Sequence, residues 1–99
     1  MPHSESKIKT DIKAYVRKEA GPYKSWYIGV TNDPERRLFV EHGVQKENGW
    51  WIYRGATSAA VARKVEEHFI NLGMDGAPGG GDEKSDVVYA YKKTSRTKP

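Results

Sequence analysis

The sequence predicts a single α+β domain in which a small antiparallel sheet of three or four strands is flanked by helices, in the order β-β-α-β-α-β. Three observations support this fold class. Several short segments alternate apolar and polar residues, as half-buried strands do. Two other segments combine helix-capping residues with an apolar face of helical period. The chain has 99 residues, which suits one domain over 1–99, with an ordered core at 7–92 and a basic tail at 93–99.

The first two strands are expected to form a hairpin. Residues 7–17 (KIKTDIKAYVR) and 25–31 (SWYIGVT) both alternate apolar and polar side chains, and the Gly-Pro pair between them is typical of a turn. Because the apolar faces of both strands share the core, Tyr15 and Tyr27 should emerge on the same side of the hairpin. A helical alternative exists for the first segment, with an apolar face formed by Ile8, Ile12, Tyr15 and Val16.

The next helix is marked at both ends. Asp33 is a suitable N-cap, Pro34 fits the first helical position, and Gly43 suits the end of the helix. Two further segments, WWIYRGA at 50–56 and VVYAYKK at 87–93, are rich in aromatic and β-branched residues. They predict the remaining two strands.

The second helix, AAVARKVEEHFINLG, contains an unexpected carboxylate. Thr57 or Ser58 caps this helix and Gly73 ends it. On the helical wheel, Glu66 lies within the flank of the apolar stripe, whereas Glu67 lies roughly opposite the centre of the stripe. A carboxylate turned toward the protein body must be ion-paired, hydrogen-bonded or bound to a metal. A salt bridge to an arginine of the preceding helix is the structural alternative.

Composition restricts the class of function. The absence of cysteine excludes a disulfide scaffold and a thiolate metal site, and a cytoplasmic location is expected. No apolar run approaches membrane-spanning length, so no membrane partner is expected. The formal net charge of +4 is compatible with a nucleic-acid partner. The three histidines do not have the spacing of metal ligands.

The tripeptide YIG at 27–29, the arginine-rich PERRL segment and the inward-facing glutamate resemble the GIY-YIG nuclease domain family. In that family a GIY tripeptide lies on the first strand, YIG follows on the second, an arginine lies on the first helix, and a glutamate lies on a later helix. Tyr27 and Gly29 match the second tripeptide. Arg37 stands at the family's spacing from Tyr27, and Glu66 matches the glutamate.

The resemblance covers about residues 10–73 and leaves the second tyrosine open. Tyr15 stands about where the tyrosine of the first tripeptide is expected. Tyr89 of the last strand is the alternative if residues 7–17 form a helix. Three departures are visible: the first tripeptide reads Lys-Ala-Tyr, the segment GAPGGGDE offers no equivalent of a late asparagine, and His42 lies one residue beyond the usual histidine position.

The resemblance implies hydrolysis of nucleic-acid phosphodiester bonds, with DNA as the expected substrate and one divalent ion, Mg²⁺ or Mn²⁺, as cofactor. Glu66 would bind the metal, Arg37 would stabilise charge on the phosphate, Tyr27 would act as base, and Tyr15 would orient water. A cation near a phenol lowers its pKa and so favours this use of tyrosine. The expected nucleic-acid contacts are Arg36, His42, Lys92 and Lys93.

Two alternatives to an active endonuclease remain. The departures from the family pattern favour a catalytically inactive module of the same fold that binds nucleic acid or protein. Trp50 and Trp51 could instead form an exposed protein-interaction anchor, although core and edge positions in the third strand suit them better. The sequence does not choose among DNA repair, recombination, restriction and mobile-element biology, and it allows a protein partner or a homo-oligomer.

Overall fold

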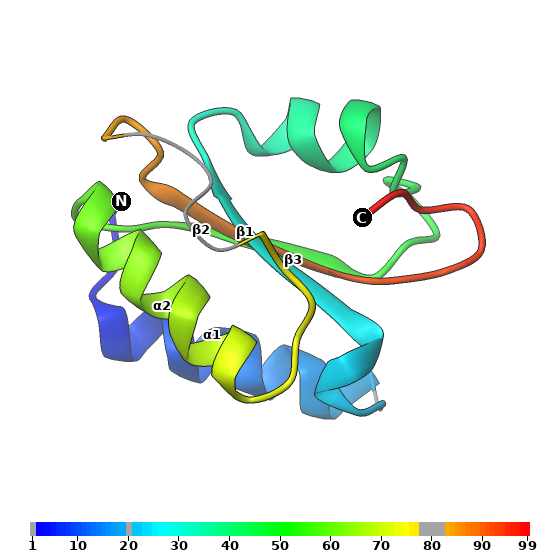
Figure 1. Ribbon diagram of the computed structural model, residues 1–99, viewed down its shortest axis with the longest axis horizontal. Coiled ribbons are helices and arrows are strands. Elements are labelled where there is room, and N and C mark those ends of the chain that lie inside the picture. Colours follow the sequence, from blue (N-terminus) through cyan, green and yellow to red (C-terminus); the bar gives the residue numbers. More distant parts are fainter. Residues whose placement is uncertain (1, 20, 78–82) are drawn as a thin grey trace.

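A computed structural model gives the fold and describes residues 2–19, 21–77 and 83–99. Figure 1 shows a central sheet with two long helices on one side and a short helix on the other. In chain order the elements are α1 (Glu5–Glu19), η1 (Tyr23–Ser25), β1 (Trp26–Thr31), η2 (Arg36–Glu41), β2 (Trp51–Gly55), α2 (Ala59–Asn71) and β3 (Val87–Lys92).

The sheet has three antiparallel strands in the order β1-β3-β2, so the last strand of the chain lies in the centre. In this register Tyr27 pairs with Tyr91, and Gly29 pairs with Tyr89. The predicted α+β class and the antiparallel sheet of three strands are therefore confirmed. The predicted order β-β-α-β-α-β is wrong, because strands and α-helices follow one another as α-β-β-α-β.

The error lies in the first segment, which forms helix α1 and not a strand. A strand would bury Thr10 and Ala14 together with the neighbouring isoleucines, but both residues are exposed. Helical spacing instead buries Ile8, Ile12 and Val16. The Ser4 hydroxyl accepts from the Lys7 amide at 3.2 Å and so caps the helix. The ion pairs Lys9–Glu5 (2.6 Å) and Lys7–Asp11 (2.9 Å), each spanning one turn, support it further.

The main core lies between the sheet and helices α1 and α2. Apolar residues of all three strands face this side. Its fully buried side chains include Ile8, Ile12, Trp26, Ile28, Val65, Phe69 and Val88. Helix α2 begins as expected at Ser58, whose hydroxyl accepts from the Val61 amide at 3.1 Å, and it ends before Gly73, which has a φ of 117°.

A second, smaller core covers the opposite face of the sheet. Tyr27, Tyr89 and Tyr91 pack there against Leu38 and Val44, which come from η2 and the loop after it. The predicted cap is present, because Asp33 Oδ1 accepts from the Arg36 amide at 3.2 Å. This layer is richer in tyrosine than the core beneath the other face, and it contains most of the predicted site residues.

Residues 93–98 turn back toward η2 and do not trail into solvent (Figure 1). The Lys93 amide donates to the Ser25 carbonyl at 2.8 Å, and the Lys98 amide donates to the His42 carbonyl at 2.8 Å. These bonds anchor the basic segment at both ends. We call residues 94–98 the strap.

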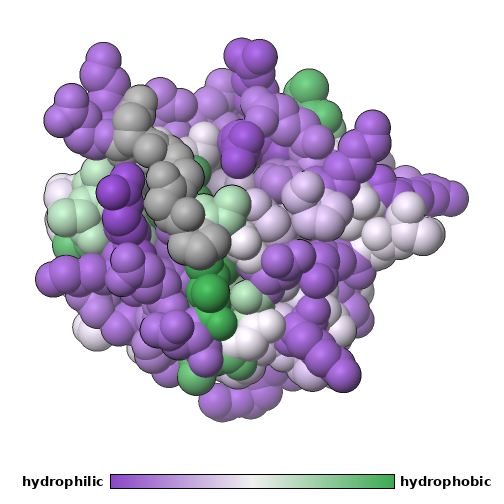
Figure 2. Space-filling model, viewed as in Figure 1, coloured by the Kyte–Doolittle hydropathy of each residue, from purple (hydrophilic) through white to green (hydrophobic). Residues whose placement is uncertain are grey.

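The surface is largely hydrophilic in the view of Figure 2. In the described part of the chain, the large hydrophobic side chains that are exposed are Val40, Trp50 and Leu72. Trp51, by contrast, is partly buried against Phe39, with ring centroids 5.0 Å apart. Among the described residues no helix is long and apolar enough to cross a membrane.

Candidate active site

Four aromatic rings gather on the sheet face that η2 covers. Tyr27 comes from β1, Tyr89 and Tyr91 come from β3, and His42 follows the end of η2. The Tyr27 ring stacks on Tyr91 with centroids 5.3 Å apart and on Tyr89 at 6.3 Å. The His42 ring lies 4.8 Å from Tyr27 and 5.5 Å from Tyr89. All four side chains are buried, so their polar atoms must find partners within the protein.

Gly29 makes room for one of these phenols. Its register partner is Tyr89, and a Cβ added to Gly29 would lie 2.5 Å from both Cζ and the hydroxyl oxygen of Tyr89. Real Cβ atoms essentially never lie so close to another atom, so the Tyr89 ring would have to shift. The glycine of the YIG tripeptide therefore lets a tyrosine of the neighbouring strand lie directly across β1.

The helix that carries Arg37 is a π-helix, and its geometry sets the position of the following His42. The His42 amide donates to the Arg37 carbonyl five residues earlier, at 2.8 Å. One turn of an α-helix ends near the fourth residue, whereas one turn of a π-helix ends near the fifth. After this wider turn the imidazole of His42 lies against the tyrosines of the sheet.

His42 is held by hydrogen bonds at both ring nitrogens. Nδ1 lies 2.7 Å from the Lys98 carbonyl oxygen, and Nε2 lies 2.8 Å from the Tyr89 hydroxyl. The Tyr91 hydroxyl also lies 3.0 Å from Nδ1. Burial lowers the pKa of His42, and the nearby Arg37 charge acts in the same direction, although the bond to Lys98 opposes them. The neutral imidazole is therefore the favoured form near neutral pH.

Arg37 brings positive charge to the same phenols. Its guanidinium is partly exposed and pairs with Glu41 at 2.5 Å. Burial raises the pKa of Tyr89 to about 12, while the charge and a hydrogen bond of Arg37 oppose this rise. Burial likewise raises the pKa of Tyr27, and Arg37 again lowers it. An additional cation at this place would favour phenolate further.

Glu66 is a buried carboxylate of α2, which packs on the face of the sheet opposite η2 (Figure 1). Its side chain is only 2% exposed, and Oε1 has no hydrogen-bond partner among the described residues. Burial raises the pKa of Glu66 to about 7, although Arg63 lowers it. The negative charge of Glu66 adds the smallest of the contributions that raise the pKa of Tyr27 and Tyr89. The predicted inward orientation of Glu66, and the exposure of its neighbour Glu67, are confirmed.

The salt-bridge alternative for Glu66 is not realised in the described part of the chain. Both arginines of η2 pair with Glu41 instead, Arg36 at 3.5 Å and Arg37 at 2.5 Å. A buried carboxylate with an unpartnered oxygen fits a divalent ion that keeps most of its water ligands, since Mg²⁺ is often bound by a single carboxylate. No group of three or more metal-ligating side chains occurs among the residues described. The described residues therefore offer Glu66 as a single candidate ligand and do not form a closed metal cage.

Tyr15 lies apart from this cluster, which corrects the expected tyrosine pair. It belongs to α1, its hydroxyl accepts from the Trp51 amide at 3.0 Å, and its ring packs edge-on against Trp26. Trp26 is part of the main core, so Tyr15 lies on the other side of the sheet from Tyr27. The alternative phenol, Tyr89, occupies the place beside Tyr27.

The remaining predicted nucleic-acid contacts lie around the cluster and not within it. Arg36 is exposed, and Lys93 pairs with Asp75 at 3.4 Å. The end of the Lys92 side chain lies near Gly21. His42 alone among them is buried with the tyrosines. Tyr91 is not among the predicted site residues, because a tyrosine in an alternating strand gives no signal beyond amphipathicity.

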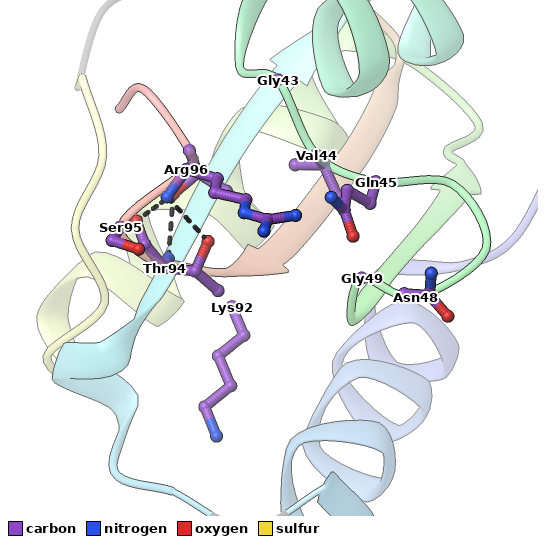
Figure 3. A pocket seen from close by; sticks show the side chains of 10 residues that line it. Gly43, Val44, Gln45, Asn48, Gly49, Lys92, Thr94, Ser95 and Arg96 are labelled. Atoms are coloured by element: carbon purple, nitrogen blue, oxygen red, sulfur yellow. Dashed lines mark hydrogen bonds between the residues drawn. The ribbon is translucent and has the colours of Figure 1, made fainter.

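Two hollows lie outside the cluster. One, of about 250 Å³, separates the loop after η2 from the strap, and Figure 3 shows the Arg96 side chain reaching toward Gln45 while Lys92 points away. The other, of about 450 Å³, lies beside the start of α2 near Arg63 and Glu67. Neither hollow is lined by the tyrosines or by Glu66. The candidate site therefore rests on the side-chain chemistry of the cluster and not on cavity size.

No protein-family model, curated protein or solved structure matches the chain.

Proposed function

We propose that the chain is a metal-dependent endonuclease of the GIY-YIG type, which hydrolyses phosphodiester bonds of nucleic acid, with DNA as the preferred substrate. One observation carries the proposal: Glu66 is buried with an unpartnered oxygen, and its charge influences Tyr27 and Tyr89. A structural carboxylate is normally satisfied by donors of its own protein. A carboxylate that serves as a ligand to a hydrated divalent ion lacks such a partner until the ion is bound.

The side chains take the following roles in this proposal. Arg37 stabilises the negative charge that builds on the phosphate oxygens in the transition state. Glu66 holds Mg²⁺ or Mn²⁺, which when bound would act as a Lewis acid and steady the leaving oxygen. Tyr89 replaces Tyr15 as the second phenol. Because its hydroxyl lies 2.8 Å from His42 Nε2, Tyr89 takes the role of base that was expected of Tyr27, and Tyr27 positions the water. His42 is the proton acceptor within reach of Tyr89.

The position of Tyr89 supports this assignment despite the inverted order of the strands. In the family pattern the first tyrosine strand precedes the second, whereas here β3 follows β1 in the chain. β3 nevertheless pairs directly with β1, so the two phenols meet as they would in a hairpin. Gly29 lies under the Tyr89 ring, where a side chain would collide with the ring. The need for glycine in the tripeptide therefore has a steric explanation in this arrangement as well.

Cleavage assays with matched variants test the proposal. Supercoiled, branched, linear duplex and single-stranded DNA, and RNA, are incubated with the full chain and Mg²⁺ or Mn²⁺. We expect cleavage by the wild type and a loss of about 100-fold or more in Glu66→Gln. Glu67→Gln, one residue away on the exposed side of α2, should retain activity. Absence of turnover on every substrate, or equal activity of the two variants, would contradict the proposal.

A second pair of variants tests which phenol acts. Tyr89→Phe removes the hydroxyl that contacts His42, and we expect it to reduce the cleavage rate about 100-fold or more. Tyr15→Phe removes a hydroxyl on the other side of the sheet, which accepts from Trp51. It should lower stability by about 1 kcal/mol while activity persists. The reverse pattern of activities would restore the assignment to Tyr15.

A binding module without catalysis is the second candidate, and one observation favours it. The two hollows lie away from Glu66, and Glu66 itself is almost fully buried. A module of this kind would bind DNA with an affinity that falls steeply with salt, and it would not cleave. Salt-dependent binding without turnover in either divalent ion would favour this candidate over the nuclease.

A further inference from the structure

The strap is tied to His42 by two reciprocal hydrogen bonds. The Lys98 amide donates to the His42 carbonyl at 2.8 Å, and His42 Nδ1 lies 2.7 Å from the Lys98 carbonyl oxygen. A turn within the strap supports this position, since the Thr97 amide donates to the Thr94 carbonyl at 3.2 Å and the Thr97 hydroxyl accepts from the Thr94 amide at 3.0 Å. The carbonyl of a residue remote in sequence is therefore held in contact with the imidazole.

The chemistry of these partners fixes the tautomer of the imidazole. A carbonyl oxygen can only accept, so His42 Nδ1 must carry the hydrogen. In the neutral ring the other nitrogen then bears a lone pair. That nitrogen, Nε2, lies 2.8 Å from the Tyr89 hydroxyl, which must donate to it. Tyr91 does not decide the matter, because its hydroxyl, 3.0 Å from Nδ1, can either donate or accept.

We propose that the backbone carbonyl of Lys98, carried by the strap, is the positioning group that holds His42 as the Nδ1–H tautomer, so that Nε2 accepts the proton of Tyr89. This inference rests on the proposed nuclease function for its catalytic meaning, whereas the tautomer itself does not depend on it. Removal of the carbonyl frees the ring to place its hydrogen on Nε2. The imidazole would then donate to Tyr89 and could no longer receive its proton.

In the proposed hydrolysis, protons move through Tyr89 and His42. Water loses a proton to the Tyr89 oxygen as its own oxygen bonds to phosphorus, and the Tyr89 hydroxyl proton passes to His42 Nε2. The bond from phosphorus to the leaving oxygen breaks, and that oxygen takes a proton from solvent. The imidazolium, protonated at both nitrogens, then returns the Nε2 proton to solvent. Lys98 takes no part in a bond change and acts through His42 alone.

The tautomer can be measured directly in the full-length wild-type chain by ¹⁵N-detected NMR of the histidine ring at neutral pH. We expect His42 to show a protonated Nδ1 and an unprotonated Nε2. Lys98→Ala, which removes the side chain and keeps the carbonyl, should show the same tautomer, and so should Tyr91→Phe. A wild-type ring protonated at Nε2 alone would overturn the inference without any reference to activity.

A deletion of residues 95–99 tests the role of the strap. We expect the folded variant to show mixed tautomers of His42 and a fall in kcat of about 10–100-fold, with KM little changed. A deletion variant that keeps the pure Nδ1–H tautomer would refute the role of the carbonyl. If the variant does not fold, the wild-type spectrum still decides. If the tautomer changes in a chain that shows no cleavage, the positioning by the strap stands and the nuclease function falls.

Discussion

Replacement of Glu66 by glutamine should change how the stability of the fold depends on pH. The folded-state pKa of Glu66 is about 7, against 4.5 for an ordinary glutamate, because burial penalises the carboxylate. Between these two values the folded state binds a proton that the unfolded state has released. The stability that Glu66 contributes is therefore fully present below pH 4.5 and is lost as the pH rises to about 7.

The expected magnitude follows from this shift. Each unit of pKa corresponds to about 1.4 kcal/mol, so the wild type should lose about 2.5 kcal/mol relative to Glu66→Gln between pH 5 and pH 8. The amide introduces a constant penalty of its own, which cancels when the two proteins are compared across pH. The titration of His42, whose lowered pKa removes stability as the pH falls, is present in both proteins and cancels as well.

Urea unfolding at several pH values between 5 and 8 measures this difference, with the slope against denaturant serving as a check on compactness. Glu67→Gln is the matched control, because Glu67 is exposed on the same helix, and it should follow the wild-type curve. If Glu66→Gln and wild type run parallel across the pH range, then Glu66 is not a desolvated carboxylate and the reasoning about the site fails.

Two further variants test the packing that holds the site together. Gly29→Ala should lower the free energy of unfolding by about 1–3 kcal/mol and reduce any cleavage activity, because its methyl would meet the Tyr89 ring. Gly55→Ala, with nothing within 4 Å of the added methyl, should be nearly neutral in the same thermal or urea melts, and equal losses in both would contradict the steric argument. Ser58→Ala should lower stability by about 1 kcal/mol, since it removes the hydroxyl that accepts from the Val61 amide; an unchanged midpoint would show that this cap is not needed.

The first segment shows why a local pattern can mislead. Ile8, Ile12 and Val16 are spaced by four, and this spacing satisfies both the period of a strand and, nearly, that of a helix. The residues that distinguish the two periods are Thr10 and Ala14, and both are small enough to suit either environment. The capping serine and the ion pairs across single turns are the signals that favour a helix here.

The candidate site was predictable where it depended on local geometry alone. The helical wheel correctly predicted that Glu66 faces inward, because this prediction needs only the phase of one helix. The partnership of Tyr89 with Tyr27 depends on β3 lying between β1 and β2, a long-range property that spacing along the chain does not contain. The π turn before His42 has no simple signature in composition, and the contact of Lys98 with His42 joins residues 56 positions apart.

Manganese binding tests the central claim most directly, because it asks whether the unpartnered oxygen of Glu66 is a metal ligand. Titration of the full chain with Mn²⁺ at pH 7.5, followed by electron paramagnetic resonance of the free ion, should reveal one bound ion in wild type and in Glu67→Gln. Glu66→Gln should bind none at that site. An ion bound equally by all three proteins, or by none of them, would contradict the account.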